Sequence, residues 1–433
     1  MMNPRYMARW LVEHGSARML MRVQARRGNP FAKLMGTAAG LADPYPYIEQ
    51  LREQGRLAHS PISWSTVDYE LARNLLRDNR FGVFGIDGFE IPEWLHRTVK
   101  SAQIPPNPVE PPSMLITDPP EHTRLRKSVS AAFTPRAIGR LRDRVESVTT
   151  ELLDALPAGG SADLVGDFAA QVPIAIISEM LGFPDSRREQ FLAWGDVMSP
   201  LLDFGIPWRT WRTAISSMLE MDAYLDDHIA RLRVEPGEDI LSSLVAAGDL
   251  DDRELKATAS LLMGAGFETT VNLIGNGIVQ LLSHREQLAL LREDEDLWPN
   301  AVEEILRFDA PVQTTARAAL CDVEIAGTAL RQGSVVVMSL AGANRDPGKF
   351  EFPDRFDITR ANAREHLTFS SGVHTCLGAS LARMEGVYAL RSLFERFPDL
   401  SLAGAPQRRP LHNLHGFARI PAQLGERATS RVQ

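Results

Sequence analysis

The chain has 433 residues and a formal net charge of -8, with 47 Lys and Arg against 55 Asp and Glu. This negative balance argues against nucleic acid as the main partner, because phosphate binding requires basic patches. Only two cysteines are present, which excludes a disulfide framework and favours a reducing, cytoplasmic location. The chain is long enough to bury a core without disulfides or structural metals.

Residues 1–42 are predicted to form a partly ordered basic segment. Its arginines, such as Arg22 and Arg26, alternate with apolar residues such as Met7 and Trp10. Such a segment either packs locally or makes peripheral contact with an anionic membrane. The arginines interrupt any secretory signal, and no run of about 20 apolar residues could form a transmembrane anchor.

The next part of the chain is predicted to be mainly helical. Short helices are expected at residues 47–55 and 68–78, on either side of a strand at 62–67. The proline-dense stretch 105–120 indicates an extended, ordered loop, since proline fixes φ and removes a hydrogen-bond donor. Amphipathic helices then follow up to about residue 247, and they are broken at Pro135, Pro157, Pro184, Pro207 and Pro236.

A long helix is predicted at residues 252–284, with acidic residues near its start. A second helix is expected at 297–309, strands at 322–325 and 334–339, and a last long helix from about residue 376 to 397. The pattern predicts a mainly α fold with small β-sheets (α+β). We expect one domain at 43–424, followed by a C-terminal tail at 425–433.

The sharpest motif is Phe369-Ser-Ser-Gly-Val-His-Thr-Cys-Leu-Gly378. It places Cys376 between two glycines and directly before a helix, whose N-terminus favours a thiolate. Three interpretations remain open on these residues alone: a haem ligand, a catalytic nucleophile, or a buried structural cysteine. A nucleophile would need a base oriented by a third group, and none is evident beside His374.

Two further motifs lie on predicted helices. In Ala265-Gly-Phe-Glu-Thr-Thr270, the Thr269 hydroxyl can bond the carbonyl of Ala265 one turn back, beside the helix-weakening Gly266. The result is either a local groove with a proton path through Glu268 or a loosely packed helix crossing. Glu304 and Arg307 share a helix face, although most such pairs are ordinary surface contacts.

Together these motifs, in this order, resemble those of the cytochrome P450 superfamily, in particular its soluble actinobacterial or mycobacterial members. The resemblance covers about residues 43–424. It includes the cysteine loop, the acid–alcohol pair and the Glu-x-x-Arg pair. Further matches are His122-Thr-Arg-Leu-Arg126, Arg317 and Pro353-Asp-Arg-Phe356. Ser370 departs from the family pattern, in which many members have a glycine.

The resemblance implies a single-domain cytochrome P450 fold with haem b between the long helix and the cysteine-loop helix. Cys376 would be the axial ligand of the iron. The residues expected to contact the cofactor are His122, Arg126, Arg317, Phe369, Gly372, His374, Cys376 and Gly378. Glu268 and Thr269 would deliver protons during the activation of O2. Arg355 would join Glu304 and Arg307 in a buried structural triad.

The implied activity is insertion of one oxygen atom from O2 into a lipophilic small molecule. A polyketide, macrolide or lipid-derived compound is favoured, and a fatty acid, steroid or terpenoid would also fit. Electrons would come from NAD(P)H through a ferredoxin and its reductase, since no dinucleotide-binding fingerprint is present. The alternatives are a peroxide-driven peroxygenase and a non-catalytic haem sensor. The expected substrate pocket is lined by Leu201, Leu202, Phe204, Leu262, Ala265, Gly266, Val312, Thr314 and Phe417.

Overall fold

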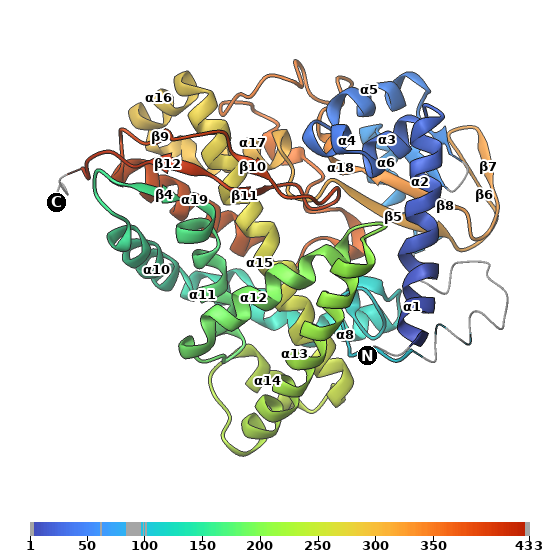
Figure 1. Cartoon of the computed structure of the whole chain (residues 1–433), viewed down its shortest axis with the longest axis horizontal. Helices are drawn as coiled ribbons and strands as arrows, with labels where there is room; N and C mark the ends of the chain where they lie inside the picture. The colour runs from blue at the N-terminus through green and yellow to red at the C-terminus, as the bar shows by residue number, and fades with distance from the viewer. Residues whose placement is uncertain (1–3, 61–62, 84–96, 98, 100–101, 429–433) are drawn as a thin grey trace.

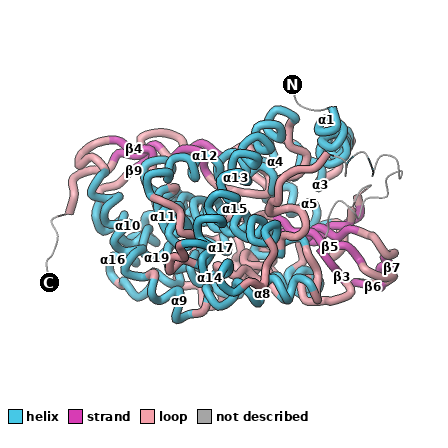
Figure 2. The backbone as a smooth tube through the Cα atoms, turned by 90° about the horizontal axis from the view of Figure 1, so that it is seen from below, coloured by secondary structure: helices cyan, strands magenta, loops and turns pink. Residues whose placement is uncertain are grey.

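The structure is a computed structural model that describes residues 4–60, 63–83, 97, 99 and 102–428. Most of these residues are helical, and the strands gather in small sheets at opposite sides of the helical body (Figure 2). The predicted mainly α fold with small β-sheets is confirmed.

The basic N-terminal segment is helical over most of its described length. Its helices are α1 (Pro4–Trp10), α2 (Ser16–Arg26), α3 (Pro30–Gly36) and α4 (Ala38–Ala42), with a π-helical turn at Leu11–Gly15 between the first two. Met21, Phe31 and Leu34 are buried in a small core with Ile48 and Val67. The segment is therefore anchored to the protein by apolar packing.

A five-stranded sheet lies beside these helices (Figure 1). Its order is β1 (Ala58–His59), β2 (Trp64–Thr66), β8 (Val335–Ser339), β5 (Thr314–Ala319) and β3 (Phe81–Val83). Only β2 and β8 pair in parallel, with Ser65 opposite Val337. The helices α5 (Tyr45–Glu53), α6 (Tyr69–Leu75) and α18 (Leu340–Asn344) accompany the sheet. The predicted helix at 68–78 thus ends three residues early, and the strand predicted at 62–67 is shorter.

The predicted proline-dense loop at 105–120 has no α-helix or strand. A succession of helices follows it, and their boundaries fall near the predicted prolines. These helices are α8 (Glu121–Ser130), α9 (Pro135–Arg140), α10 (Arg142–Ala155), α11 (Gln171–Met180), α12 (Arg188–Met198), α13 (Trp208–Val234) and α14 (Ile240–Ala247).

The predicted long helix is α15 (Asp252–Ser283), which runs through the middle of the helical body (Figure 1). It starts at a complete capping box, in which the side chain of Asp251 accepts from the backbone N–H of Glu254 and the Glu254 side chain accepts from Asp251 N–H. It packs against α11, α12 and α19 (Ala379–Arg396). A Cβ at Gly277 would lie 2.7 Å from Cδ1 of Leu390, so glycine permits the close approach of α15 and α19.

The remaining elements complete the last third of the chain. Helices α16 (Arg285–Glu293) and α17 (Trp298–Phe308) follow α15. The smaller sheets pair β4 (Ser161–Asp163), β12 (Pro421–Gln423) and β9 (Ser401–Leu402); β10 (Gln407–Arg408) with β11 (Phe417–Arg419); and β6 (Val323–Ile325) with β7 (Thr328–Leu330). None of the helices in the described ranges is both long and apolar enough to cross a bilayer.

Candidate active site

The loop before α19 holds Cys376 in a strained but well-connected turn. The backbone N–H of Cys376 donates to the carbonyl of Phe369 at 2.9 Å, which closes the loop. Ser370 has a φ of 61°, a left-handed value that favours glycine and explains why a glycine is common here in the family it resembles. Gly372 has a φ of 75°, and a Cβ there would lie 2.4 Å from the carbonyl oxygen of Leu76. Gly372 is therefore required by both backbone conformation and space.

The Cys376 residue is exposed, although dense protein surrounds its thiol. Burial raises the pKa of the thiol, against the opposing effects of the Gly378 backbone N–H and the positive charges of Arg126 and Arg383. Desolvation thus raises the thiol pKa by more than the helix N-terminus, expected from the sequence to lower it, can offset. Coordination to a metal cation removes the proton from a thiol outright.

A cluster of basic side chains lies beside this loop. The rings of His122, on α8, and His374 have their centroids 4.2 Å apart. Arg126 donates to the carbonyl of Thr375 at 2.7 Å, which ties α8 to the cysteine loop. Arg317, on β5, is only 7% exposed, and within the described chain it bonds neutral oxygens of its own strand.

This basic cluster is short of negative charge. Both ring nitrogens of His122 and Nε2 of His374 are buried and have no hydrogen-bond partner among the described residues. Burial, followed by the charges of Arg317, His122 and Arg126, lowers the pKa of His374 to about 3. Among the described residues the nearest carboxylate is that of Asp118, 4.0 Å from Nε2 of His374. Unpaired donors and cations in this arrangement fit a ligand that carries carboxylates.

The acid–alcohol motif lies in the middle of α15. The Thr269 hydroxyl donates to the carbonyl of Ala265 at 2.7 Å, as the sequence predicts. Ala265 is exposed although Leu262 and Phe267 on the same helix are buried. A Cβ at Gly266 would meet nothing closer than Ile177 Cδ1 at 3.6 Å. Small residues therefore leave one face of α15 open beside Thr269.

Glu268 is the one acidic residue of the motif, and its side chain is completely buried next to that open face. Nε of Arg409 lies 2.9 Å from its Oε1, but neither carboxylate oxygen accepts a hydrogen bond from a described residue. Burial raises the pKa of Glu268 to about 7; the charge of Arg409 and the side chain of Asn272 lower it, and the charge of Asp196 raises it further. A carboxyl with this pKa can gain and lose a proton at neutral pH.

Arg409 connects Glu268 to the outside of the protein. Its Nη1 pairs with Oδ1 of Asp196, whose side chain is 58% exposed. Neither residue was predicted from the sequence, because neither lies in a motif and each reaches the site only through the tertiary fold. The two ion pairs therefore link the buried carboxyl group of Glu268 to the exposed side chain of Asp196.

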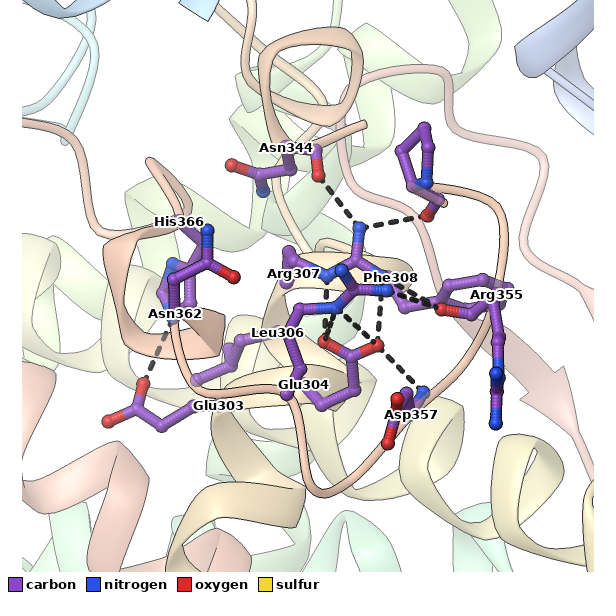
Figure 3. Close-up of polar contacts among 12 residues, drawn as sticks. Glu303, Glu304, Leu306, Arg307, Phe308, Asn344, Arg355, Asp357, Asn362 and His366 are labelled. Carbon is purple, nitrogen blue, oxygen red and sulfur yellow. Dashed lines mark hydrogen bonds and ion pairs between the residues drawn. The ribbon is translucent and has the colours of Figure 1, made fainter. Parts of the chain in front are cut away.

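Glu304 and Arg307 form a buried ion pair on α17 (Figure 3). Arg307 donates twice to the Glu304 carboxylate, at 2.7 and 2.8 Å, and both side chains are fully buried. Arg307 also donates to the carbonyls of Asn344 and Pro353, each at 2.9 Å. The pair therefore ties α17 to α18 and to the loop that leads towards the cysteine.

The predicted third member of this triad is wrong. The Arg355 side chain is directed away from Glu304 (Figure 3), and only its carbonyl accepts hydrogen bonds, from Arg307 and Arg360. Nε of Arg360 instead lies 3.2 Å from Oε2 of Glu304, and its side chain is 8% exposed. Arg360 lies five residues further along the loop and is turned inward, whereas Arg355 is exposed.

The residues predicted to line a substrate pocket lie in different settings. Thr314 is nearly buried and its hydroxyl donates to Oδ1 of Asn413 at 2.8 Å. Phe417 is 5% exposed beneath the guanidinium of Arg408. Phe204 is 43% exposed, so it lies outside the packed core. The protein contacts of Thr314 and Phe417 argue against an open lining position, and the pocket as a whole stays a prediction.

The fold and this site together define a haem-thiolate oxygenase. A family model described as Cytochrome P450 matches residues 99–424. The chain is 46% identical over 427 residues to a Mycobacterium tuberculosis protein designated cytochrome P450 140, covering 96% of this chain and 97% of that protein. It is also 46% identical over 321 residues to 6-deoxyerythronolide B hydroxylase of Saccharopolyspora erythraea, covering 72% and 78%.

Solved structures agree with the sequence comparisons. The ligand-free structure of Mycobacterium smegmatis CYP164A2 matches with a TM-score of 0.82 at 32% identity, covering 91% of this chain and 99% of that one. The chain belongs to the cytochrome P450 family and is a monooxygenase of that family. The unpaired basic groups beside Cys376 fit the two propionates of the haem that this family uses.

Proposed function

We propose that this protein inserts one oxygen atom from O2 into a lipophilic polyketide- or lipid-derived molecule, with Cys376 as the iron ligand. The observation that carries the proposal is the buried, ionisable Glu268 next to Thr269 on the open face of α15. A protein that only stored or sensed haem would have no need of a proton path. The polyketide preference is supported by the named substrate of one relative, 6-deoxyerythronolide B hydroxylase.

His122, Arg126, Arg317 and His374 would hold the propionates of the haem, and the sulfur of Cys376 would bind its iron. When bound, haem supplies the chemistry of oxygen activation, which an electron-rich thiolate ligand favours. Phe369, Gly372 and Gly378 shape the loop that presents this sulfur.

The protein's own part in the reaction is to move protons and exclude bulk water. The Thr269 hydroxyl can hold a hydrogen-bonding partner on the open face of α15 while it donates to Ala265. Glu268 supplies a proton at neutral pH, while Arg409 holds its carboxyl group and is itself anchored by the exposed Asp196. The expected cytoplasmic location stays a prediction.

The ligand assignment is tested by the reduced, CO-bound spectrum of the purified protein. Wild type and Cys321→Ser should both show the far-red-shifted Soret band of a thiolate-bound haem, because Cys321 is exposed and lies outside the site. Cys376→Ser should lose that band. If Cys376→Ser kept it, the proposed ligand would be wrong.

The proton path is tested by turnover with a ferredoxin, its reductase and NADPH. Thr269→Ala should divert electrons to hydrogen peroxide, whereas Thr269→Ser should retain coupling because it keeps the hydroxyl. Equal coupling in both variants would remove Thr269 from the path. Turnover with hydrogen peroxide alone, and none with the reductase system, would instead identify a peroxygenase.

Electron delivery would use the basic surface near the cysteine loop. Three basic residues, Arg124, Lys127 and Arg383, are candidates there. Arg383 is held by Glu303 at 2.7 Å, and Arg124 pairs with Glu121 and Glu254. Lys127 is exposed and has no ion pair in the described chain. Lys127 is therefore the residue of the three best able to attract an acidic ferredoxin.

Lys127→Glu should slow reduction by ferredoxin and make it less sensitive to salt. The matched control is Arg331→Glu, an exposed residue beyond β7. Equal reduction rates in wild type and Lys127→Glu would discard this docking surface.

A further inference from the structure

The outward face of α2 forms a shallow hollow against the start of α13. Its volume is about 460 Å³. The residues lining it are Trp10, Gly15, Arg18, Met19, Arg22, Val23, Arg26, Pro207 and Trp208. We call this surface the α2 face. Helix α1, which leads into α2, lies at the upper border of the molecule in Figure 2, so the surface begins on the periphery.

The α2 face and its surroundings expose large apolar side chains. Met19 is 71% exposed and Leu11 is 50% exposed, and Met7 and Phe204 follow at 38% and 43%. Four of the large exposed apolar residues of the described chain thus lie on α1, the turn after it, α2 and the loop before α13. Single exposed apolar residues are common, but a group beside a hollow marks an interaction surface.

The same surface carries positive charge that the protein does not compensate. Arg18, Arg22 and Arg26 are spaced four residues apart and so share one face of the helix. Arg22 and Arg26 make no ion pair or hydrogen bond with the described residues, and Arg18 donates only to the carbonyl of Gly205, at 2.9 Å. The one acid in residues 1–42 is Glu13, which is held by Arg9 at 2.6 Å.

The α2 face is firmly joined to the loop before α13. Nε1 of Trp10 donates to the carbonyl of Ile206 at 2.9 Å, next to the contact between Arg18 and Gly205. A Cβ at Gly205 would lie 3.3 Å from Cα of Arg18, which shows how closely the two backbones approach. Any partner that binds the α2 face would therefore contact this loop as well.

From this combination we infer that the α2 face docks the protein on an anionic lipid bilayer. Uncompensated arginines attract lipid phosphates, and exposed methionine, leucine and phenylalanine side chains can enter the boundary between headgroups and acyl chains. A second copy of the chain is a poorer occupant, since a two-fold contact would bring the arginines of both copies together. An acidic protein would satisfy the arginines but gives no reason for the exposed apolar side chains. The inference does not depend on the proposed substrate or electron donor.

The test is co-sedimentation of the haem-loaded protein with vesicles. Equimolar phosphatidylglycerol and phosphatidylcholine should bind the protein, and phosphatidylcholine alone should bind it far more weakly. One arginine near an anionic surface contributes roughly a factor of five, so Arg22→Glu with Arg26→Glu should weaken binding by at least roughly 30-fold.

The matched control is Arg136→Glu with Arg140→Glu. These exposed arginines also lie four residues apart, on α9, which is well separated from α1 in Figure 2. The control variant has the same net charge and should bind as wild type does. Equal loss in both double variants would show that only net charge matters, and that result would overturn the α2 face as the docking surface.

The apolar contribution is measured at high salt, where the attraction between charges is screened. Met19→Gln should reduce the binding that remains under those conditions, because Met19 is the most exposed of the four apolar residues. If the wild-type protein did not bind anionic vesicles, the inference would be overturned. A dimer in light scattering that Arg22→Glu with Arg26→Glu dissociates would also overturn it, since the α2 face would then join two copies.

Discussion

Replacing Glu268 by Gln should change how the stability of this protein depends on pH. Burial raises the pKa of Glu268 to about 7, from 4.5 in an exposed glutamate. The native state therefore binds a proton that the unfolded state releases between those two pH values, so the wild-type fold loses stability as the pH rises. Between about pH 5 and about pH 8 the wild-type free energy of unfolding should fall by roughly 2 to 3 kcal/mol, and that of Glu268→Gln should not show this fall.

The assay is urea unfolding of wild type and Glu268→Gln at a series of pH values. The difference between the two free energies of unfolding isolates the titration of residue 268, since all other groups are shared. Glu146→Gln, at an exposed position on α10, serves as the control, and its free energy of unfolding should follow that of wild type at every pH. The free energies of unfolding of wild type and Glu268→Gln could instead change in parallel from about pH 5 to about pH 8. Residue 268 would then not titrate in this range, and the proposed proton path would lose its basis.

Two further substitutions test the structural parts of the site. Arg360→Ala should lower the free energy of unfolding by about 3 kcal/mol, because it removes one of the cations beside the buried Glu304. Arg355→Ala should change this free energy by less than about 0.5 kcal/mol. Urea unfolding measures both, and equal losses would contradict the assignment of Arg360. Gly372→Ala should lower haem content and the melting temperature, because its Cβ would collide with the Leu76 carbonyl at 2.4 Å. A variant that loads haem fully and melts with wild type would show that the loop can shift.

The parts of the fold that sequence reasoning predicted well are those with local signals. The helix expected at 252–284 differs from α15 by one residue, since the capping residues Asp251 and Glu254 specify its start. The cysteine loop was recognised because its residues are contiguous, and Ser370 keeps the positive φ that glycine favours although it departs from the family pattern. Contiguous motifs can be recognised in a sequence because their own residues specify the local backbone conformation.

Sequence reasoning failed where the partner of a charge is chosen by the tertiary fold. Arg355 and Arg360 lie in one loop without helical or strand periodicity, so spacing gives no indication of which side chain turns inward. Arg409 is similar: it reaches Glu268 from a distant part of the chain and no local pattern marks it. These choices depend on how the loops pack against α17 and α15, which only the three-dimensional structure reveals.

The contrast between buried glutamates explains why one of them is suited to chemistry. Glu304 accepts hydrogen bonds from Arg307 and from the backbone N–H of Asp357, with Arg360 alongside, so its charge is fully compensated. Glu268 is equally buried, but Arg409 is the one cation paired with it within the described chain. The protein therefore surrounds Glu304 with hydrogen-bond donors, whereas burial raises the pKa of Glu268 to about 7. Since Glu268 lies next to Thr269, its carboxyl group is placed where the proposed proton transfer would use it.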